Sequence, residues 1–595
     1  MSKSKRISLN IFLLKTPEDQ KTKKIFDEYD YIQKTVTATG KAKLVSTRSF
    51  PLGVGGELGH IYIKTPIIKS IPEWVEFFVS DLPNGDELDN LKNQSTSALL
   101  IREISGRQFA IAFGHGRHLL DLNCIEYRFG IKVALNVIET GSISSIDRQT
   151  FDSSPRLTKT QTVKPSAISE YGVNTEQDLL KGVVGSVQSI YQATFGSVVA
   201  GIDSLKISVI TSLDKIDDIL KNALSRYESK DYLKSDDDRA SAFAWVDNLQ
   251  AVPDHKTKIL LDQKLWENIE SNNFETIFLA IPEMIEWEKI SGFAYTEAQL
   301  KDPNSLVNSL DIVELKKSLR SDSDIKTLKN RPIFMALNTN EGTRKFSTYK
   351  CIYAEIKLLH EKFLYILTAG NWFKVEPSFE KQIDNYFKSV SLQKYALPFM
   401  EYDHDGEGSY NDEIAASPKN EYILLDRKMI QFGGRHSSIE VCDLYKTKPA
   451  GKISGELVHV KRGRESSTLS HLFAQGLVSS TLLASEKDFI TQVNLQIHAQ
   501  GGSPFPPKFP TGDYDVVFAI VDGAAGESLD IPFFSKVNFR NCAHSIRAFG
   551  FGVKFLHIPE SATYLAKSKA KKAAKAAAKK SASGKPVLPT ATVVP

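Results

Sequence analysis

The chain has 595 residues, which at about 100 to 200 residues per domain predicts several folded units rather than one. Hydrophobic residues make up 41% and charged residues 25%, a composition that excludes a disordered or collagen-like protein. The net charge is +4, but residues 565–595 contain eight lysines and no acid, so the rest of the chain carries a net charge of −4. The basic character therefore belongs to the C-terminal segment and predicts no general affinity for nucleic acid.

No stretch reaches the roughly 18 consecutive apolar residues that a membrane span needs, which excludes an integral membrane protein. The cysteines lie far apart without a CxxC pair, which argues against a disulfide framework or a zinc knuckle. We therefore expect a cytoplasmic protein that does not bind membranes. The four cysteines are Cys124, Cys351, Cys442 and Cys542.

Residues 1–141 are predicted to form an α/β domain, because short β-type runs alternate there with turn signals. These runs cover residues 7–14, 60–68, 109–113 and 130–136. Between residues 142 and 177 the chain is polar and has few apolar anchors, which predicts a connecting arm on the surface.

Residues 178–395 are predicted to be a mostly helical middle region that ends in a hairpin. Apolar residues recur there at spacings of three and four, as on the buried face of an amphipathic helix. The residues of this stripe are Leu205, Val209, Leu213, Ile216, Ile219, Leu220 and Leu224. Strands are expected at 332–335, 350–357 and 363–368, and the last runs into a turn at Gly370 and Asn371.

Residues 396–564 are predicted to form a second α/β domain, in which a helix and a three-strand meander precede alternating helices and strands. The expected helices cover 411–416, 468–484 and 535–549, and the expected strands cover 422–432, 438–445, 456–461, 514–521 and 553–558. Residues 565–595 are predicted to be a disordered tail rich in Lys and Ala. Its lysines would either be solvated on a helix-prone segment or act as an electrostatic tether for a polyanion.

Five polar residues in the second α/β domain form a candidate active site: Glu413, Asp443, His459, Lys461 and Gln475. His459 and Lys461 are two apart on one expected strand, so their side chains point to the same face, toward Asp443 of the neighbouring strand. This constellation resembles the PD-(D/E)xK nuclease superfamily, and in particular its Mrr-like variant with Gln-x-Lys in place of Glu-x-Lys. The resemblance implies a restriction-endonuclease-like fold and catalytic roles for these five residues.

The resemblance also implies a divalent metal, Mg²⁺ or Mn²⁺, bound by Asp443 and His459. Phosphodiester cleavage needs a hard cation that polarises the phosphoryl oxygen and activates water, while Lys461 would stabilise developing charge. Because His459 replaces a carboxylate, the expected site favours Mn²⁺ or a transition metal over Mg²⁺. Glu440 competes with Asp443, since the two would lie on opposite faces of one strand and at most one would enter a shared site.

Two basic segments are candidates for binding nucleic acid. Arg462 and Arg464 precede the next expected helix, whose N-terminus would hold a phosphate. His115, Arg117 and His118 lie in a loop bracketed by glycines, where backbone N–H groups and the guanidinium would contact an anion. The alternative for each segment is a solvated turn, which needs no function. The alternative for Glu440, Asp443 and Lys461 is that they are half-exposed strand residues of an α/β domain without an active site.

Nearly the whole folded length resembles an uncharacterised, sporadically distributed family of bacterial proteins with a domain of unknown function. The resemblance rests on blocks in the same order, among them 113–121 (FGHGRHLLD), 129–136 (FGIKVALN), 370–373 (GNWF), 439–444 (IEVCDL), 458–462 (VHVKR), 469–476 (LSHLFAQG) and 532–535 (PFFS). Such a patchy distribution is typical of mobile defence or restriction islands. It implies an antiviral role and a protein partner from the same operon.

From these observations we expect a metal-dependent, nuclease-like hydrolase that cleaves foreign nucleic acid, with DNA favoured, in anti-phage or restriction-type defence. The alternative is a catalytically inactive nucleic-acid-binding or sensor protein that uses a nuclease-like fold. A third interpretation is an interaction scaffold without a nucleic-acid partner.

Overall fold

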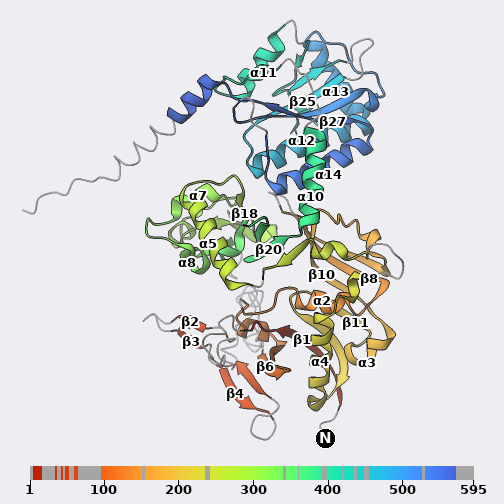
Figure 1. Ribbon diagram of the computed structural model, residues 1–595, viewed down its shortest axis with the longest axis vertical. Helices are drawn as coiled ribbons and strands as arrows, with labels where there is room; N and C mark the ends of the chain where they lie inside the picture. Colours follow the sequence, from red (N-terminus) through yellow and green to blue (C-terminus); the bar gives the residue numbers. More distant parts are fainter. Residues whose placement is uncertain are drawn as a thin grey trace, which may run out of the picture. The chain divides into compact units, whose positions relative to one another are not determined.

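A computed structural model of the chain divides into two compact units. The first unit comprises Met1–Thr150, Pro155–Glu267 and Leu279–Glu376, and the second comprises Phe151–Ser154, Asn268–Phe278 and Pro377–Pro595. The structure describes residues 4–16, 32, 34–36, 42–44, 47–52, 59–64, 96–122, 124–150, 155–234, 241–252, 254–338, 343–358, 361–391, 399–417, 421–432, 438–447, 455–524 and 529–570. Figure 1 shows the chain with its helices and strands labelled.

The first unit contains a ten-stranded antiparallel sheet in the order β4-β5-β6-β7-β1-β12-β11-β10-β8-β9. In chain order its strands are β1 (Lys5–Leu13), β4 (Thr47–Pro51), β5 (His60–Lys64), β6 (Ser97–Ile104), β7 (Arg107–Gly114), β8 (Ile138–Thr150), β9 (Leu157–Ser166), β10 (Asp178–Val187), β11 (Val198–Gly201) and β12 (Leu205–Thr211). Strand β12 alternates strictly between buried and exposed residues, as a sheet with one solvated face requires.

Helices α2 (Phe129–Leu135) and α4 (Ile216–Glu228) cover the buried face of this sheet and share its apolar core. Two glycines allow the close approach of α2. A Cβ atom at Gly130 would lie 2.0 Å from the Ser204 carbonyl oxygen, and one at Gly201 would lie 2.2 Å from the Gly130 carbonyl oxygen. Any side chain at either position would push the helix away from the sheet.

Further elements before residue 377 form smaller sheets. A five-stranded sheet has the order β13-β20-β19-β18-β14, a three-stranded sheet the order β15-β16-β17, and β2 pairs with β3. Their bounds are β2 (Lys34–Val36), β3 (Ala42–Leu44), β13 (Leu249–Ala251), β14 (Ile277–Leu279), β15 (Ile290–Ala294), β16 (Pro332–Leu337), β17 (Thr343–Ser347), β18 (Ile352–Lys357), β19 (Leu364–Thr368) and β20 (Asn371–Val375). The helices here are α3 (Gln192–Phe195), α5 (His255–Glu270), α6 (Glu297–Leu300), α7 (Ile312–Ser318), α8 (Ile325–Asn330) and α9 (Thr348–Cys351).

The second unit contains a five-stranded mixed sheet in the order β21-β24-β25-β26-β27. The first three strands pair antiparallel, and β25, β26 and β27 run parallel. The strand bounds are β21 (Ile423–Leu424), β24 (Leu444–Lys446), β25 (Gly455–Arg462), β26 (Tyr514–Val521) and β27 (Gly552–Ile558), and the short strands β22 (Ile430–Gln431) and β23 (Ser438–Ile439) pair with each other. Helices connect the parallel strands, as parallel pairing requires.

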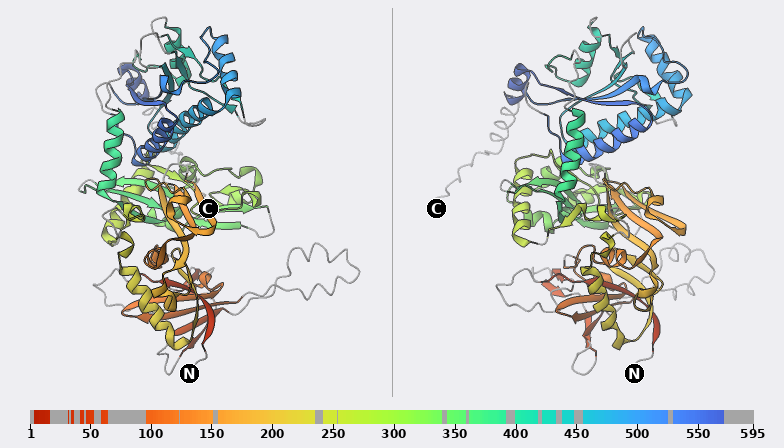
Figure 2. Two further views of the ribbon diagram at one scale, coloured as in Figure 1. Left: turned by 90° about the vertical axis from the view of Figure 1, so that its right-hand side faces the viewer. Right: turned by 45° about the vertical axis from the view of Figure 1, so that its right-hand side comes forward.

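Helices cover both faces of this sheet (Figure 2). Alternate residues of the central strands enter two separate apolar cores. One core contains α10 (Pro377–Ser391), α12 (Ser466–Ser485), α13 (Lys487–Ala499) and α14 (Phe533–Ala548), and the other contains α11 (Glu407–Ala416). Because β26 is covered on both faces, its sequence is apolar nearly throughout.

The structure confirms the general prediction of a multidomain protein that mixes helices with sheets, and corrects several elements of the first unit. The predicted polar arm at 142–177 is wrong, because strands β8 and β9 occupy most of it. Strand β9 is polar because it lies at the edge of its sheet, where most of its side chains are exposed or half-buried. The predicted strand at 130–136 is helix α2.

The middle region at 178–395 is not mostly helical, because many strands of the smaller sheets lie there. The stripe that begins at Leu205 was misleading, since Leu205 and Val209 satisfy the period of a strand as well as that of a helix. They belong to β12, Leu213 begins a short 3-10 helix, and only the residues from Ile216 onward form an α-helix. The hairpin at Gly370 and Asn371 is confirmed, because β19 and β20 pair across that turn.

In the second unit the order of the predicted elements is confirmed, although α13 was missed. Residues 562–570 are helical, which contradicts the predicted disordered tail over residues 565–570. Residues 571–595 and the end of the predicted strand at 60–68 lie outside the described residues. Within the described part of the chain, no helix is both long and apolar enough to cross a membrane.

Candidate metal centre

Asp443 lies immediately before β24 and is fixed to β25 by two hydrogen bonds. Its backbone N–H donates to the Val458 carbonyl over 2.9 Å, and its Oδ2 atom accepts from the Val460 N–H over 2.6 Å. The carboxylate therefore takes its position from the backbone of a central strand and not from a flexible neighbour.

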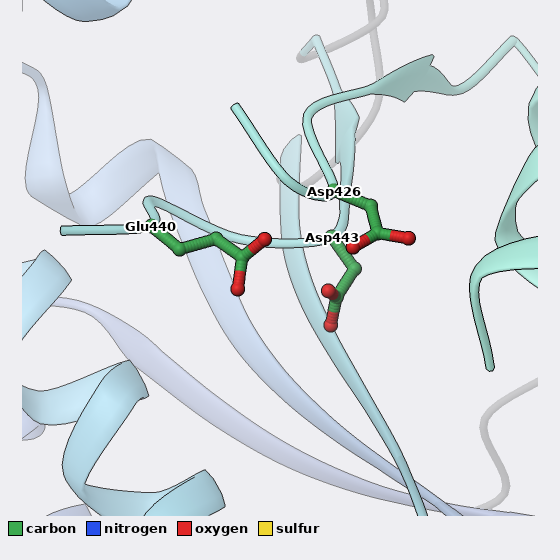
Figure 3. A group of neighbouring side chains, drawn as sticks. All are labelled: Asp426, Glu440 and Asp443. Atoms are coloured by element: carbon green, nitrogen blue, oxygen red, sulfur yellow. The ribbon is translucent and has the colours of Figure 1, made fainter. Parts of the chain in front are cut away.

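Asp443 forms an acidic group with Asp426 and Glu440, and Figure 3 shows these three side chains gathered at one place. One ligand oxygen from each residue lies within 4.8 Å of the others, and all three residues are half-buried. The backbone N–H groups of Leu425 and Asp426 each donate to the Asp443 carbonyl over 2.9 Å, and the Arg427 N–H donates to Glu440. The chain thus ties together the three segments that carry the acids.

This acidic group was not predicted, because the strands that flank it were expected to be longer than they are. The predicted strand at 438–445 is interrupted, and no ladder runs through residues 440–443. The rule that alternate residues face opposite ways does not apply there, so Glu440 and Asp443 converge instead of excluding each other. The predicted strand at 422–432 is also interrupted, by a turn that contains Asp426 and in which Arg427 has φ of 61°.

Burial raises the pKa of Asp443 well above its usual range, and the nearby charges of Glu440, Asp426 and Glu407 raise it further, against the hydrogen bond from Val460. Burial also raises the pKa of Glu440; the Asp426 charge adds to this, and Lys461 and Arg427 oppose it. Carboxylates that repel each other at this range bind either a proton or a cation.

Lys461, on β25, is paired with Glu407, the first residue of α11. The Lys461 Nζ atom donates to Glu407 Oε2 over 2.8 Å, and the Arg462 N–H donates to Glu407 Oε1 over 2.9 Å. A single carboxylate thus links the start of α11 to the end of β25. Because Glu407 also raises the pKa of Asp443, the pair lies within electrostatic range of the acidic group.

Glu413, the helix acid that the sequence analysis selected, lies elsewhere. It is half-exposed and pairs with His404. Helix α11 begins at Glu407, earlier than predicted, and at about 100° per residue the six-residue separation puts Glu413 roughly 240° around the helix from Glu407. Glu407 therefore occupies the position that was assigned to Glu413.

His459 is not a member of the acidic group within the described residues. Its side chain is 2% exposed, and its ring stacks on Phe518 of β26 with the centroids 6.0 Å apart. Burial lowers the pKa of His459 to about 4, so the ring is neutral at pH 7. The structure gives no support to its predicted role as a metal ligand beside Asp443.

Gln475 is half-buried on α12, and among the described residues no hydrogen bond joins it to the acidic group. Arg462 and Arg464 both form internal ion pairs. Arg462 Nε lies 2.8 Å from Glu560, and Arg464 Nε lies 3.1 Å from Glu275 and 3.4 Å from Asp522. The predicted phosphate-binding turn is thus largely neutralised by acids of its own unit.

The predicted anion loop of the first unit is a tight turn after β7. His115, Arg117 and His118 are exposed. The backbone N–H of His115 donates to Thr96 and that of His118 donates to His115, so neither is free for an anion. A Cβ atom at Gly116 would lie 1.9 Å from the Ala98 carbonyl oxygen, so this glycine serves packing. Nothing in this geometry requires a ligand.

Comparison with known proteins places the chain in a family. The match to a family of unknown function, DUF6119, covers residues 9–559. The chain belongs to this family. The expected relationship to an uncharacterised family is therefore confirmed. The match includes the acidic group and Lys461 and ends one residue before Glu560.

No curated protein and no solved structure matches the chain. The resemblance to nucleases thus stays a prediction.

Proposed function

We propose that the second unit is a divalent-metal-dependent phosphodiesterase that cleaves foreign nucleic acid, with DNA favoured, in bacterial defence. The observation that carries the proposal is the acidic group of Asp426, Glu440 and Asp443 beside Lys461. Carboxylates that can hold a divalent ion, together with a lysine that can donate to a phosphate oxygen, are residue types that metal-dependent phosphodiester hydrolysis uses.

The donor set fits Mg²⁺ or Mn²⁺. Both ions prefer carboxylate oxygens, and Mg²⁺ is commonly held by one or two carboxylates together with substrate phosphate and water. The earlier preference for a transition metal rested on the nitrogen ligand of His459, which is not in the acidic group. With oxygen ligands alone, that reason to disfavour Mg²⁺ disappears.

A bound divalent ion would polarise a phosphoryl oxygen and lower the pKa of an attacking water. The protein's own residues have separate tasks. Asp426, Glu440 and Asp443 would hold the ion and position the phosphate. Lys461, whose side chain is 33% exposed, would donate to a non-bridging phosphate oxygen once Glu407 releases it.

The order of elements supports the same proposal. A helix, antiparallel strands, a crossover helix and a parallel strand follow one another from α11 to β26, which is the order that the resemblance to PD-(D/E)xK nucleases implies. In this chain, Glu440 and Asp426 would supply the carboxylate charge that His459 lacks.

The decisive experiment is a cleavage assay with supercoiled plasmid, linear duplex and single-stranded RNA in Mg²⁺ or Mn²⁺. We expect metal-dependent cleavage by the natural protein and a loss of at least about 100-fold in Asp443→Asn and Lys461→Ala. Asp488→Asn, which changes an exposed acid on α13, is the matched control and should cleave normally. Cleavage that persists in Asp443→Asn would refute the assigned site.

A second candidate function is metal-dependent binding of nucleic acid without cleavage. The observation in its favour is the pairing of Lys461 with Glu407, which occupies the ammonium group. Metal-stimulated binding with no cleavage of any substrate would identify this function.

A further inference from the structure

Arg427 contacts the acidic group through both its backbone and its side chain. Its backbone N–H donates to Glu440. Its Nε atom lies 3.4 Å from Asp426 Oδ2, and its Nη2 atom donates to Asp412 Oδ1 on α11 over 3.1 Å. The guanidinium therefore serves as an internal countercharge for Asp426.

The Arg427 guanidinium lies on the solvent side of this contact. Its side chain is 64% exposed, whereas that of Asp426 is 11% exposed. A Cβ atom at Gly408 would lie 3.2 Å from the Arg427 Cζ atom, so the guanidinium rests on the backbone of α11. The Asp412 partner is also exposed, and exposed ion pairs contribute little to stability. The guanidinium can therefore leave Asp426 at a small cost in free energy.

Asn411 indicates that a cation belongs beside Asp426. This residue of α11 is 1% exposed, and its Nδ2 atom donates to the same Asp426 Oδ2 atom over 3.3 Å. Its Oδ1 atom is buried and has no hydrogen-bond partner among the described residues. A buried oxygen of this kind needs a donor or a cation, and carboxylate and carbonyl oxygens are ligands that suit Mg²⁺ and Mn²⁺.

The position of the Asn411 amide fits an ion that Asp426 also binds. Half a turn about the Cβ–Cγ bond would exchange Oδ1 with Nδ2 and leave Oδ1 about 3.3 Å from Asp426 Oδ2. Neighbouring oxygen ligands of a six-coordinate ion with bonds of about 2.1 Å lie about 3.0 Å apart. The two oxygens can therefore share one ion after a small adjustment.

A divalent ion on Asp426 and the Arg427 guanidinium exclude each other, because both are positive and both lie against Oδ2. Asp426 and Asn411 are largely buried and Arg427 is exposed, so the guanidinium is the group that moves. Its contact with Asp412 keeps it close to α11. An arginine held there is suited to a phosphate, because its planar guanidinium binds two phosphate oxygens at once.

We infer that a divalent ion displaces Arg427 from Asp426, and that the released guanidinium then binds the phosphate that is to be cleaved. The inference rests on the proposed function, because it takes a phosphodiester as the substrate. Arg427 should therefore oppose the binding of the ion alone and favour the binding of the ion together with a phosphate. A residue with a purely structural role would not have these two opposite effects.

The first test measures Mn²⁺ binding by isothermal titration without nucleic acid. Arg427→Gln removes the charge and keeps the backbone N–H that donates to Glu440. We expect it to bind Mn²⁺ about 2- to 5-fold more tightly than the natural protein, the effect of one exposed charge. Arg547→Gln, which removes an exposed arginine on α14, is the matched control and should leave the affinity unchanged. Weaker or unchanged Mn²⁺ binding by Arg427→Gln would overturn the inference.

A double-mutant cycle shows whether this effect passes through Asp426. In an Asp426→Asn background, Glu440 and Asp443 remain to bind the ion. Arg427→Gln should then change the Mn²⁺ affinity by less than about 2-fold, because the oxygen for which the two cations compete no longer carries a charge. An undiminished effect in that background would also overturn the inference.

The second test measures the binding of a duplex with phosphorothioate linkages by fluorescence anisotropy, in a chelator and in saturating Mn²⁺. In the chelator, Arg427→Gln should bind within about 2-fold of the natural protein, because Asp426 and Asp412 hold the guanidinium. In Mn²⁺ it should bind at least about 3-fold more weakly. Arg427→Lys keeps the charge but loses the planar pair of donors, so its loss should be intermediate. An equal loss in both conditions would contradict displacement by the ion.

Cleavage assays separate this inference from the proposed catalysis. If no variant cleaves nucleic acid but Arg427→Gln shows both effects on binding, the inference stands and the catalysis fails. If the natural protein and Arg427→Gln cleave equally well and Asp443→Asn does not cleave, the catalysis stands and the inference fails.

Discussion

His459 shows how one residue can resemble a site ligand in sequence and serve the core in the fold. It lies two positions before Lys461 and opposite Phe518 in the parallel pairing of β25 with β26. Its Nε2 atom is buried and has no hydrogen-bond partner among the described residues. A neutral ring is the form that such a position accepts.

His459 gives the first prediction, on the pH dependence of stability. Its pKa is about 4 in the folded state against an ordinary value of 6.5, so the unfolded state binds more protons between these values. The free energy of unfolding should therefore rise with pH from about 4 to 6.5, by about 3 kcal/mol from this group. His459→Phe should flatten that part of the profile, measured by urea unfolding. The exposed His471 is the control. If His471→Gln changes the pH profile as much as His459→Phe does, this pH dependence does not come from His459.

Asp443 gives the second prediction, in which its contribution to the free energy of unfolding falls as the pH rises. Its pKa is raised in the folded state, so the folded protein holds this proton more tightly than the unfolded chain. Without metal, its contribution to stability should grow as the pH falls through the folded pKa and be lost as the pH rises through it. Asp443→Asn keeps an acceptor for the Val460 N–H and should raise the free energy of unfolding of the metal-free protein at pH 7. Thermal unfolding in a chelator measures this, and a less stable variant would contradict it.

At the scale of elements, short interruptions of strands decide the candidate site. Strands β21 to β24 are two or three residues long, and the acidic residues lie between or beside them. The start of α11 has the same importance, since it determines which glutamate reaches β25. Local breaks in the strands thus bring Asp426 and Glu440 to Asp443, which is itself positioned by the central strand β25.

The third prediction concerns Glu407 and Glu413 on α11. The Glu407 charge pairs with Lys461 and raises the pKa of Asp443, and Glu407→Gln removes that charge. Protons should then compete less with Mn²⁺ for Asp443, so the pH optimum for Mn²⁺ binding should move to a lower value. Glu413→Gln changes a half-exposed acid on another face and should leave the optimum unchanged. Isothermal titration with Mn²⁺ from pH 5 to 8 compares the two variants. Equal shifts would show that Glu407 has no special relation to the site.

The fourth prediction concerns the packing of α2 on the ten-stranded sheet. Gly130→Ala would place a Cβ atom 2.0 Å from the Ser204 carbonyl oxygen, so the helix must move. We expect a loss of about 1 to 3 kcal/mol in the free energy of unfolding of the first unit. Gly512→Ala, where a Cβ atom meets nothing within 4 Å, is the control for a glycine substitution. Similar unfolding curves for Gly130→Ala and the natural protein would contradict the close packing.

For the whole molecule, the positive charge is concentrated after residue 565. Removing residues 571–595 takes away six lysines and changes the net charge from +4 to −2. The remaining chain then has no excess of cations to attract a polyanion.

The fifth prediction follows from that balance. A protein that ends at Ala570 should bind duplex DNA weakly without a divalent ion, because nothing then neutralises the acidic group. About 1 mM Mn²⁺ should raise its affinity by about 10-fold or more. The same truncation combined with Asp443→Asn should show no such rise. Anisotropy titrations with and without Mn²⁺ measure both. A metal effect of equal size in the two proteins would place the relevant ion elsewhere.

The sequence by itself determined the multidomain α/β character, the element order of the second unit, the family and the concentration of positive charge after residue 565. These follow from composition, periodicity and turn residues, which act locally. It also selected Asp443 and Lys461 as candidates, because Asp443 lies near the end of one expected strand and Lys461 lies on the next.

Only the tertiary structure decided which acids join them. Asp426, Glu440 and Glu407 come from a turn, an interrupted strand and a helix start. The periodicity of a sequence does not locate the ends of helices and strands to within one or two residues. The same holds for β12, where a spacing of four residues fits both a strand and a helix, and burial against α2 and α4 selects the strand. Local patterns specify elements, whereas packing determines where those elements end and which side chains meet there.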